Sequence, residues 1–180
     1  MKNTLLAVVL LLSVFTGNAQ TQTEIKDDVP QQNEVKLNAL FMVVGAFNFT
    51  YERLINEESG VGLEVFVPFD EDIDVNYYIS PYYRLYFGKK YAAGFFLEGF
   101  GMLNSVNVYN YFEYDSFDSI IREERKDETN FALGIGLGGK WITKSGFIGE
   151  LSFGIGRNLI DTDYNDEVVG KVGITVGYRF

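Results

Sequence analysis

VVGKVGITVGYRF, residues 168–180, is the stretch of sequence that decides the fold. Large apolar side chains occupy alternate positions in it, and glycine, threonine or a cation lies between them. Successive side chains of a strand point to opposite faces. One face would therefore carry Val172, Ile174, Val176, Tyr178 and Phe180, and the other Lys171, Gly173, Thr175, Gly177 and Arg179. The stretch predicts a strand with one large apolar face and one face of small or charged residues.

The same alternation recurs in seven earlier segments, which we also interpret as strands. The eight predicted strands are residues 35–44, 47–55, 61–69, 75–87, 91–104, 130–142, 147–157 and 168–180. Tight turns at 56–59, 88–90 and 143–146 alternate with longer links at 70–74, 106–129 and 158–167, although the link at Gly45-Ala46 is short. This asymmetry is typical of outer-membrane barrels. We therefore predict an all-β fold, an eight-stranded antiparallel transmembrane β-barrel in up-and-down meander order.

The size of the two faces indicates which one meets lipid. The interior of an eight-stranded barrel is only just wide enough to be filled by side chains. Glycines with a few long charged residues fit such a space, whereas a full inward set of Phe, Leu, Ile and Trp would be crowded. We therefore expect the apolar face to contact lipid, with Trp141, Tyr178 and Phe180 forming part of an aromatic belt at the membrane interface.

The same phase, carried through all eight strands, predicts a charge network in the lumen. Its members are Lys36, Glu52, Glu64, Arg84, Glu98, Lys140, Glu150, Lys171 and Arg179. Five cations and four anions are close to the neutrality that a closed, mostly dry lumen requires. With Glu98 inside, Phe96, Phe100 and Met102 must also point inward. Pro81 cannot donate to a strand ladder, so we expect a bulge near it that could shift the register.

The first part of the chain predicts export. Met1 and Lys2 precede an apolar run and the small residues Gly17-Asn18-Ala19, the pattern of a cleaved signal peptide over residues 1–19. A flexible periplasmic lead-in would occupy 20–34 and the barrel 35–180. The absence of cysteine excludes a lipid-anchor motif and any disulfide framework. The predicted location is the bacterial outer membrane, in a Gram-negative envelope.

Several strand motifs carry a resemblance to known proteins. They are KLNALF at 36–41, YERLIN at 51–56, SPYYRLYFGKK at 80–90 and FFLEGFG at 95–101. With eight strands, the chain resembles the small outer-membrane barrels typified by the OmpA transmembrane domain and OmpX, and more specifically a family of uncharacterised bacterial outer-membrane barrels. The resemblance implies a fold and a location but no activity. The terminal aromatic Phe180 resembles the signal that the barrel-assembly machinery recognises, which implies that machinery as a partner during insertion.

The residue types present argue against catalysis. The chain has no histidine, so it lacks the general base of Ser-His-Asp triads and of His-dependent acyl hydrolases. It lacks both favoured zinc ligands, Cys and His. The glycines of GIGLGG at 134–139 alternate within a strand with no helix after them, unlike a dinucleotide loop. The inward glutamates could act as acid and base, but a salt-bridged filling explains them more simply. We predict no enzyme and no cofactor.

The predicted outer links offer two further candidate sites. Acidic residues that could ligate Ca²⁺ or Mg²⁺ are Asp70, Glu71, Asp72 and Asp74 in one link and Asp161, Asp163 and Asp166 in another. They lack full calcium-loop spacing, so we interpret them as solvated charge and predict no metal site, although metal could bridge them to lipopolysaccharide. The link at 106–129 combines aromatics with a charged run. It could contact a partner surface or sugar headgroups, or extend the hairpin beyond the membrane, which we favour.

Three functions remain open. The first is a non-enzymatic outer-membrane barrel with a structural or surface-interaction role through its outer loops. The second is a small gated ion pore or transporter, and the third is a soluble periplasmic lipocalin-like carrier with its faces reversed. Without residues 1–19 the chain has 14 Lys and Arg against 25 Asp and Glu, a net charge of −11, which argues against nucleic acid. Expected partners are outer-membrane lipid, lipopolysaccharide and the assembly machinery, with the barrel itself a monomer.

Overall fold

The computed structural model describes residues 31–114, 120–159 and 168–180, without the side chains of 108–114 and 120–126. The signal peptide predicted at 1–19 lies outside the described residues. So does the predicted lead-in up to residue 30, together with Asp161, Asp163 and Asp166.

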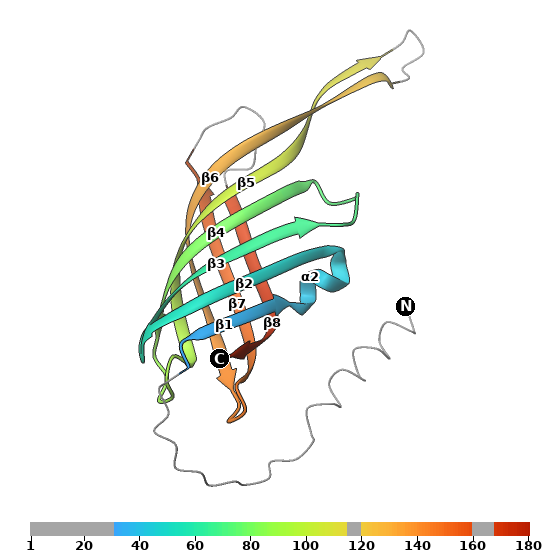
Figure 1. The fold of residues 1–180 in the computed structure, drawn as a ribbon. Helices are drawn as coiled ribbons and strands as arrows, with labels where there is room; N and C mark the ends of the chain where they lie inside the picture. The colour runs from blue at the N-terminus through green and yellow to red at the C-terminus, as the bar shows by residue number, and fades with distance from the viewer. Residues whose placement is uncertain (1–30, 115–119, 160–167) are drawn as a thin grey trace. The chain divides into compact units, whose positions relative to one another are not determined.

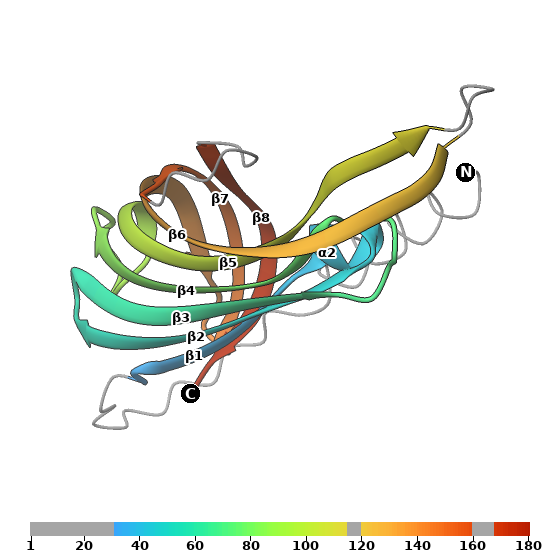
Figure 2. The same cartoon turned by 90° about the horizontal axis from the view of Figure 1, so that it is seen from above.

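The described residues form eight strands that follow one another around a closed barrel in chain order (Figures 1 and 2). They are β1 (Asn33–Asn38), β2 (Ala46–Asn56), β3 (Ser59–Pro68), β4 (Val75–Tyr86), β5 (Gly94–Tyr114), β6 (Ile120–Ile142), β7 (Phe147–Asn158) and β8 (Val168–Arg179). Each is antiparallel to its neighbours, and β1 pairs with β8 to close the ring. The predicted eight-stranded antiparallel meander is confirmed. Among the described residues, no helix is long and apolar enough to span a membrane.

The first predicted strand, 35–44, is wrong at both ends. β1 begins at Asn33 and ends at Asn38, where a short helix, α2 (Ala39–Val44), takes over. The Asn38 side chain caps this helix by accepting a hydrogen bond of 3.2 Å from the Leu40 N–H. Gly45 ends it in the left-handed region, at φ 103°. The six residues of α2 are all apolar, so they do not alternate as a strand with one lumen face would. The link between β1 and β2, predicted to be only Gly45-Ala46, therefore also includes this helix.

The link predicted at 106–129 is mostly strand. β5 and β6 run on past the other strands as a hairpin that reaches Tyr114 and Ile120 (Figures 1 and 2). This confirms the hairpin extension and corrects the predicted strands 91–104 and 130–142. β5 also begins at Gly94 rather than at residue 91, because residues 87–93 form the turn that precedes it.

The bulge expected at Pro81 is absent. β4 pairs Ile79 with Leu103 and then Tyr82 with Phe100, so the register is the same on both sides of the proline. Pro81 points outward and interrupts the ladder locally without inserting a residue. The register shifts of β2–β3 and β4–β5 lie elsewhere, between Leu54 and Asn56 and between Val75 and Tyr77.

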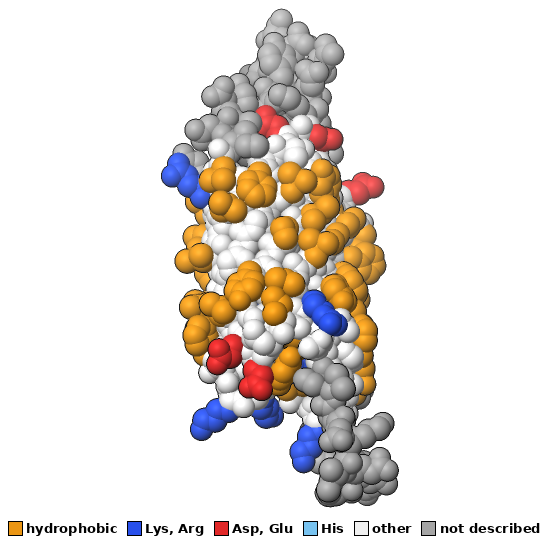
Figure 3. All heavy atoms as spheres, turned by 60° about the vertical axis from the view of Figure 1, so that its left-hand side comes forward, with side chains coloured by type: hydrophobic (Ala, Val, Ile, Leu, Met, Phe, Trp, Pro, Cys, Tyr) orange, Lys and Arg blue, Asp and Glu red, His pale blue; other side chains and the backbone are white. Residues whose placement is uncertain are grey.

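The two faces of the wall have the predicted phase. On β8, Val172, Ile174, Val176 and Tyr178 are exposed, as is Phe180 after it, whereas Gly173, Thr175 and Arg179 are buried. Phe96, Phe100 and Met102 are buried with Glu98, as expected. Hydrophobic side chains cover the middle of the surface in Figure 3, and most of the charged ones lie toward its two ends. The core is therefore the lumen, and the apolar face points away from it.

Candidate functional site

The lumen contains all nine charged residues that the sequence placed there, and most of them are almost fully buried. Because inward positions recur at every second residue, each strand contributes one or two of them. Ion pairs link them into one chain of charges that runs along the barrel. Its order is Glu64, Lys171, Glu98, Arg84, then Glu52 and Glu150, then Lys36, Glu34, Lys140 and Arg179.

Glu52 on β2 is the centre of this network. Its carboxylate lies 2.6 Å from the Lys36 ammonium and 3.3 Å from both Arg84 and Lys140. Two phenols, Tyr82 and Tyr86, also donate hydrogen bonds to it. Glu52 is completely buried. Three cations and two hydroxyls around one carboxylate satisfy its acceptor capacity, which is what burial of a charge requires.

Glu34 is the charged member of the network that sequence reasoning missed. It was assigned to the lead-in, but it is the second residue of β1 and is fully buried. Its carboxylate lies 2.6 Å from Arg179 and 2.7 Å from Lys140. The signal was present, because Glu34 lies two residues before Lys36 and therefore on the same strand face. With Glu34, the network among the described side chains holds five cations and five anions, so it is neutral.

Toward the other end, Lys171 on β8 joins two carboxylates. It lies 2.8 Å from Glu64 and 2.9 Å from Glu98. Glu64 also accepts hydrogen bonds from Asn48 and from the Tyr78 hydroxyl, at 2.7 and 2.6 Å. These two neutral partners had not been predicted. Both lie at inward positions, on β2 and β4, so the alternation of each strand places them in the lumen. Nothing in the sequence indicated which carboxylate they would contact.

Aromatic rings fill the space between the charges. The Arg84 guanidinium lies 3.8 Å from the ring centroid of Phe96 and 4.7 Å from that of Tyr82. Three inward rings each lie over a glycine that pairs with them on the next strand, and a Cβ on that glycine would overlap the ring. The pairs are Tyr82 with Gly62, Phe96 with Gly138 and Phe100 with Gly134. A polar cavity of about 20 Å³ lined by Asn48, Thr50, Glu98 and their neighbours has room for about one water.

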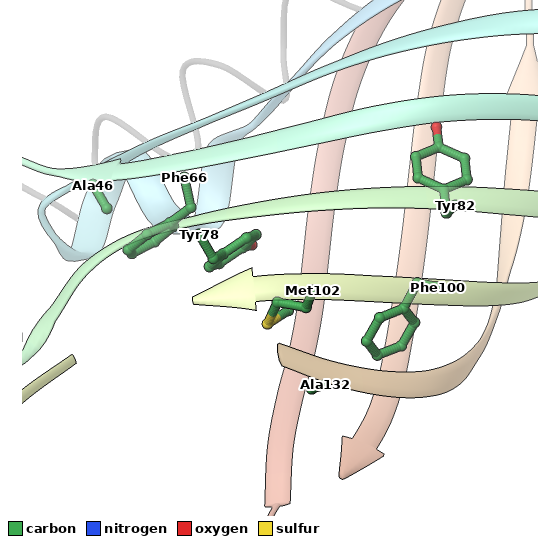
Figure 4. Packing of buried hydrophobic residues seen from close by; sticks show 7 residues of the cluster. All are labelled: Ala46, Phe66, Tyr78, Tyr82, Phe100, Met102 and Ala132. Carbon is green, nitrogen blue, oxygen red and sulfur yellow. The ribbon is translucent and has the colours of Figure 1, made fainter. Parts of the chain in front are cut away.

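Both ends of the lumen are closed by apolar clusters. At the end that carries α2 and the β5–β6 hairpin, which we call the mouth, the mouth cluster comprises Ala46, Phe66, Tyr78, Tyr82, Phe100, Met102 and Ala132 (Figure 4). At the opposite end, the turn end, the cluster comprises Leu54, Tyr86, Ala92 and Phe96. The turn at 87–93 folds inward there, and Arg179 donates hydrogen bonds to the Tyr91 and Ala92 carbonyls.

The predicted belt residues lie on the outer surface at the turn end. Trp141 is 60% exposed, and Tyr178 and Phe180 are also exposed. Further exposed rings pair beside them, Phe147 with Tyr178 and Phe87 with Phe95. A second group lies at the mouth, where Phe47 and Phe69 are 4.9 Å apart between centroids.

The acidic link between β3 and β4 is exposed, and Asp70 accepts a hydrogen bond from the Asp72 backbone at 3.1 Å. Within the part of the chain that the structure describes, no three acidic side chains come close enough to hold a metal ion. The buried carboxylates of the lumen already face cations at ion-pair distance.

A family model described as "Protein of unknown function (DUF3575)" matches residues 5–170. The chain belongs to the DUF3575 family. No curated protein sequence matches it significantly. The fold of this DUF3575 chain is similar to the N-terminal β-barrel domain of Pseudomonas aeruginosa OprF, with a TM-score of 0.60 and 12% sequence identity over 84% of this chain and 98% of that domain. This likeness supports the expected OmpA-like barrel fold, whereas the resemblance to OmpX stays a prediction.

For the DUF3575 chain, the orientation of the two faces argues against one of the three functions considered above. A lipocalin-like carrier requires an apolar cavity inside and polar side chains outside. The structure has the reverse arrangement, with the ion-pair network inside and large hydrophobic side chains such as Ile135 and Trp141 exposed. What the arrangement does chemically is to fill and neutralise the barrel.

Proposed function

We propose that this chain is a non-enzymatic outer-membrane β-barrel that contributes to envelope structure or to surface interactions through the hairpin and links at its mouth. The observation that carries the proposal is the outward apolar band between two groups of aromatic side chains. An exposed apolar surface of this extent is unfavourable in water. In a bilayer it is the surface that hydrocarbon requires, with aromatic rings at both interfaces.

The height of the band fits a bilayer. Phe131 near the mouth and Trp141 near the turn end both point outward from β6, ten residues apart. At roughly 3.3 Å per residue and a strand tilt of about 40°, their separation along the barrel axis is about 25 Å. Transmembrane barrels carry an apolar band of about this height.

The filled lumen supports a structural role over transport or catalysis. Its charges are paired, its rings cover the space that the glycines leave, and both ends carry apolar clusters. A reactive carboxylate would need access to substrate, and Glu52 has none because it is completely buried. The proposal therefore includes no catalytic residue and no cofactor.

In this proposal the signal peptide at 1–19 directs export of the chain, and the barrel-assembly machinery then inserts it into the outer membrane. Phe180 is well placed for recognition because its ring is exposed while its backbone is hydrogen-bonded to Asn33. Once inserted, the barrel would contact outer-membrane lipid and lipopolysaccharide as a monomer. In the described barrel every strand pairs on both sides, so it offers no open edge within the closed ring.

Cell fractionation tests the location. The mature chain should appear in the outer-membrane fraction and migrate differently on a gel before and after boiling, as a folded barrel does. Trypsin added to intact cells should cut the hairpin at Arg122, Arg125 or Lys126, whereas Lys89, Lys90 and Lys144 at the turn end should be cut only after permeabilisation. A chain recovered in the soluble periplasmic fraction would overturn the proposal.

A further inference from the structure

The mouth of the barrel contains an apolar pocket that the charge network does not use. Its volume is about 450 Å³, within the usual range for small-molecule sites. The lining comes from α2, from β3, β4 and the link between them, and from β5, β7 and β8. The lining residues that carry the argument are Phe41, Phe66, Tyr78, Met102, Asn104 and Val169.

The floor of the pocket separates it from the charges below. Phe66 and Tyr78 stack with their centroids 4.8 Å apart and their planes 5° from parallel. Phe41 packs edge-on against Phe66 at 5.1 Å. The Tyr78 hydroxyl donates to Glu64 beneath, which holds the ring across the lumen. In Figure 4 the rings of Phe66 and Tyr78 lie nearest α2, Met102 lies next to them, and Tyr82 and Phe100 lie farther from α2.

One side of the pocket is polar but uncharged. Asn104 on β5 donates a hydrogen bond of 3.3 Å to the Asn158 side chain on β7. An amide side chain has two N–H donors and an oxygen acceptor, and this bond takes only one of the Asn104 N–H groups. Asn104 can therefore also meet the polar end of a ligand.

We infer that this pocket binds a neutral aliphatic amide or alcohol, with its chain against Val169 and Met102 and its polar end at Asn104. The absence of charge from the described lining determines which chemical class of ligand the pocket would bind. None of the described lining side chains is ionised, so a carboxylate or ammonium group would meet no charged partner among them. At the roughly 30 Å³ that one molecule takes up in liquid water, the volume equals that of about 15 waters, which is room for a short aliphatic chain with a polar end.

Methionine methyl groups provide a direct test. The chain without residues 1–19 contains two methionines, Met102 on the pocket floor and Met42 on the exposed side of α2. Protein labelled with ¹³C at the methionine methyls would be placed in phospholipid nanodiscs and titrated with octanamide. The Met102 resonance should shift saturably, whereas Met42 should show only the small linear change that partition of the probe into lipid produces.

Octanoate is the matched control, because it has the same chain with a charged head. It should bind at least tenfold more weakly than octanamide. Asn104→Leu should weaken octanamide binding roughly tenfold by removing the hydrogen-bonding end. Val169→Phe, which fills the pocket, should abolish the saturable shift. Gel mobility before and after boiling shows whether each variant is folded. If Val169→Phe does not fold, Asn104→Leu still tests whether octanamide binds in the pocket.

Three results would overturn the inference: an unresponsive Met102, equal binding of octanoate, or full binding by folded Asn104→Leu. The nanodisc experiment also depends on the proposed membrane location. Failure of the chain to insert would be seen on the gel before any probe is added, so the two failures are distinguishable.

Discussion

Tyr82 on β4 pairs with Gly62 on β3, and the tip of its ring occupies the space that a Cβ at position 62 would need. From this position the Tyr82 hydroxyl donates to Glu52 at 3.0 Å. A glycine in one strand thus allows an aromatic residue in the next to reach the central carboxylate. Phe96 over Gly138 and Phe100 over Gly134 repeat the arrangement between β5 and β6.

Gly62→Ala should therefore destabilise the barrel by about 1 to 3 kcal/mol, because the new methyl displaces a ring that packing holds in place. Denaturant unfolding in lipid vesicles measures the change. Gly99→Ala is the matched control, since Gly99 points outward with nothing within 4 Å of its Cβ position, and it should change stability by no more than about 0.5 kcal/mol. In a Tyr82→Leu background, Gly62→Ala should be less harmful, and equal effects in both backgrounds would contradict the packing argument.

Glu52→Gln should cost about 3 to 5 kcal/mol in the same assay, because it leaves three buried cations facing a neutral amide. The double variant Glu52→Gln/Lys36→Met keeps four cations against four anions and should lose less stability than Glu52→Gln alone. Glu57→Gln, at an exposed turn position, is the control and should be neutral. If Glu52→Gln were as stable as Glu57→Gln, the ion-pair network would not contribute to stability as argued.

Ile135→Arg tests whether the outer face meets lipid. Ile135 is 71% exposed near the middle of the apolar band, so an arginine there should cost about 2 to 4 kcal/mol in a bilayer. Phe131→Arg, on the same face of β6 but close to the mouth, should cost only about 0 to 1 kcal/mol. In a water-exposed barrel the two substitutions would have the same small effect.

Planar-bilayer recordings should show little or no steady conductance, since both lumen ends carry apolar clusters and the charges between them are paired. Under the pore alternative, Arg84→Gln would alter conductance while leaving stability intact. We expect the opposite, a loss of stability with no change in conductance. Large stable channels formed by the unmodified chain would contradict the filled-lumen interpretation.

Phe180→Ser should reduce the amount of barrel assembled in cells while leaving refolding of the purified chain into lipid unchanged. The substitution keeps the backbone hydrogen bonds with Asn33 and removes only the exposed ring. Phe147→Ser, at an exposed aromatic position of the same end, is the control and should assemble normally. Equal assembly of the two variants would argue against recognition of the terminal aromatic.

Local alternation predicted much of the barrel, and the failures have local causes too. Residues 39–44 are apolar without alternation, and they form a helix that Asn38 caps by accepting a hydrogen bond from the Leu40 N–H. Pro81 removes a donor but keeps its place in the register, because its outward ring needs no extra residue. Glu34 was missed because the polar residues before it suggested a lead-in, although its spacing from Lys36 gave it an inward position.

The sequence by itself determined the number of strands and which side chains point inward, because a period of two is a property of the extended backbone alone. Only the tertiary structure decided which inward residues meet. Glu34 and Arg179 are 145 residues apart and become neighbours because β8 closes on β1. Ring closure and strand register also placed Tyr82 over Gly62 and assembled the pocket at the mouth, since those contacts depend on how strands align rather than on any one strand.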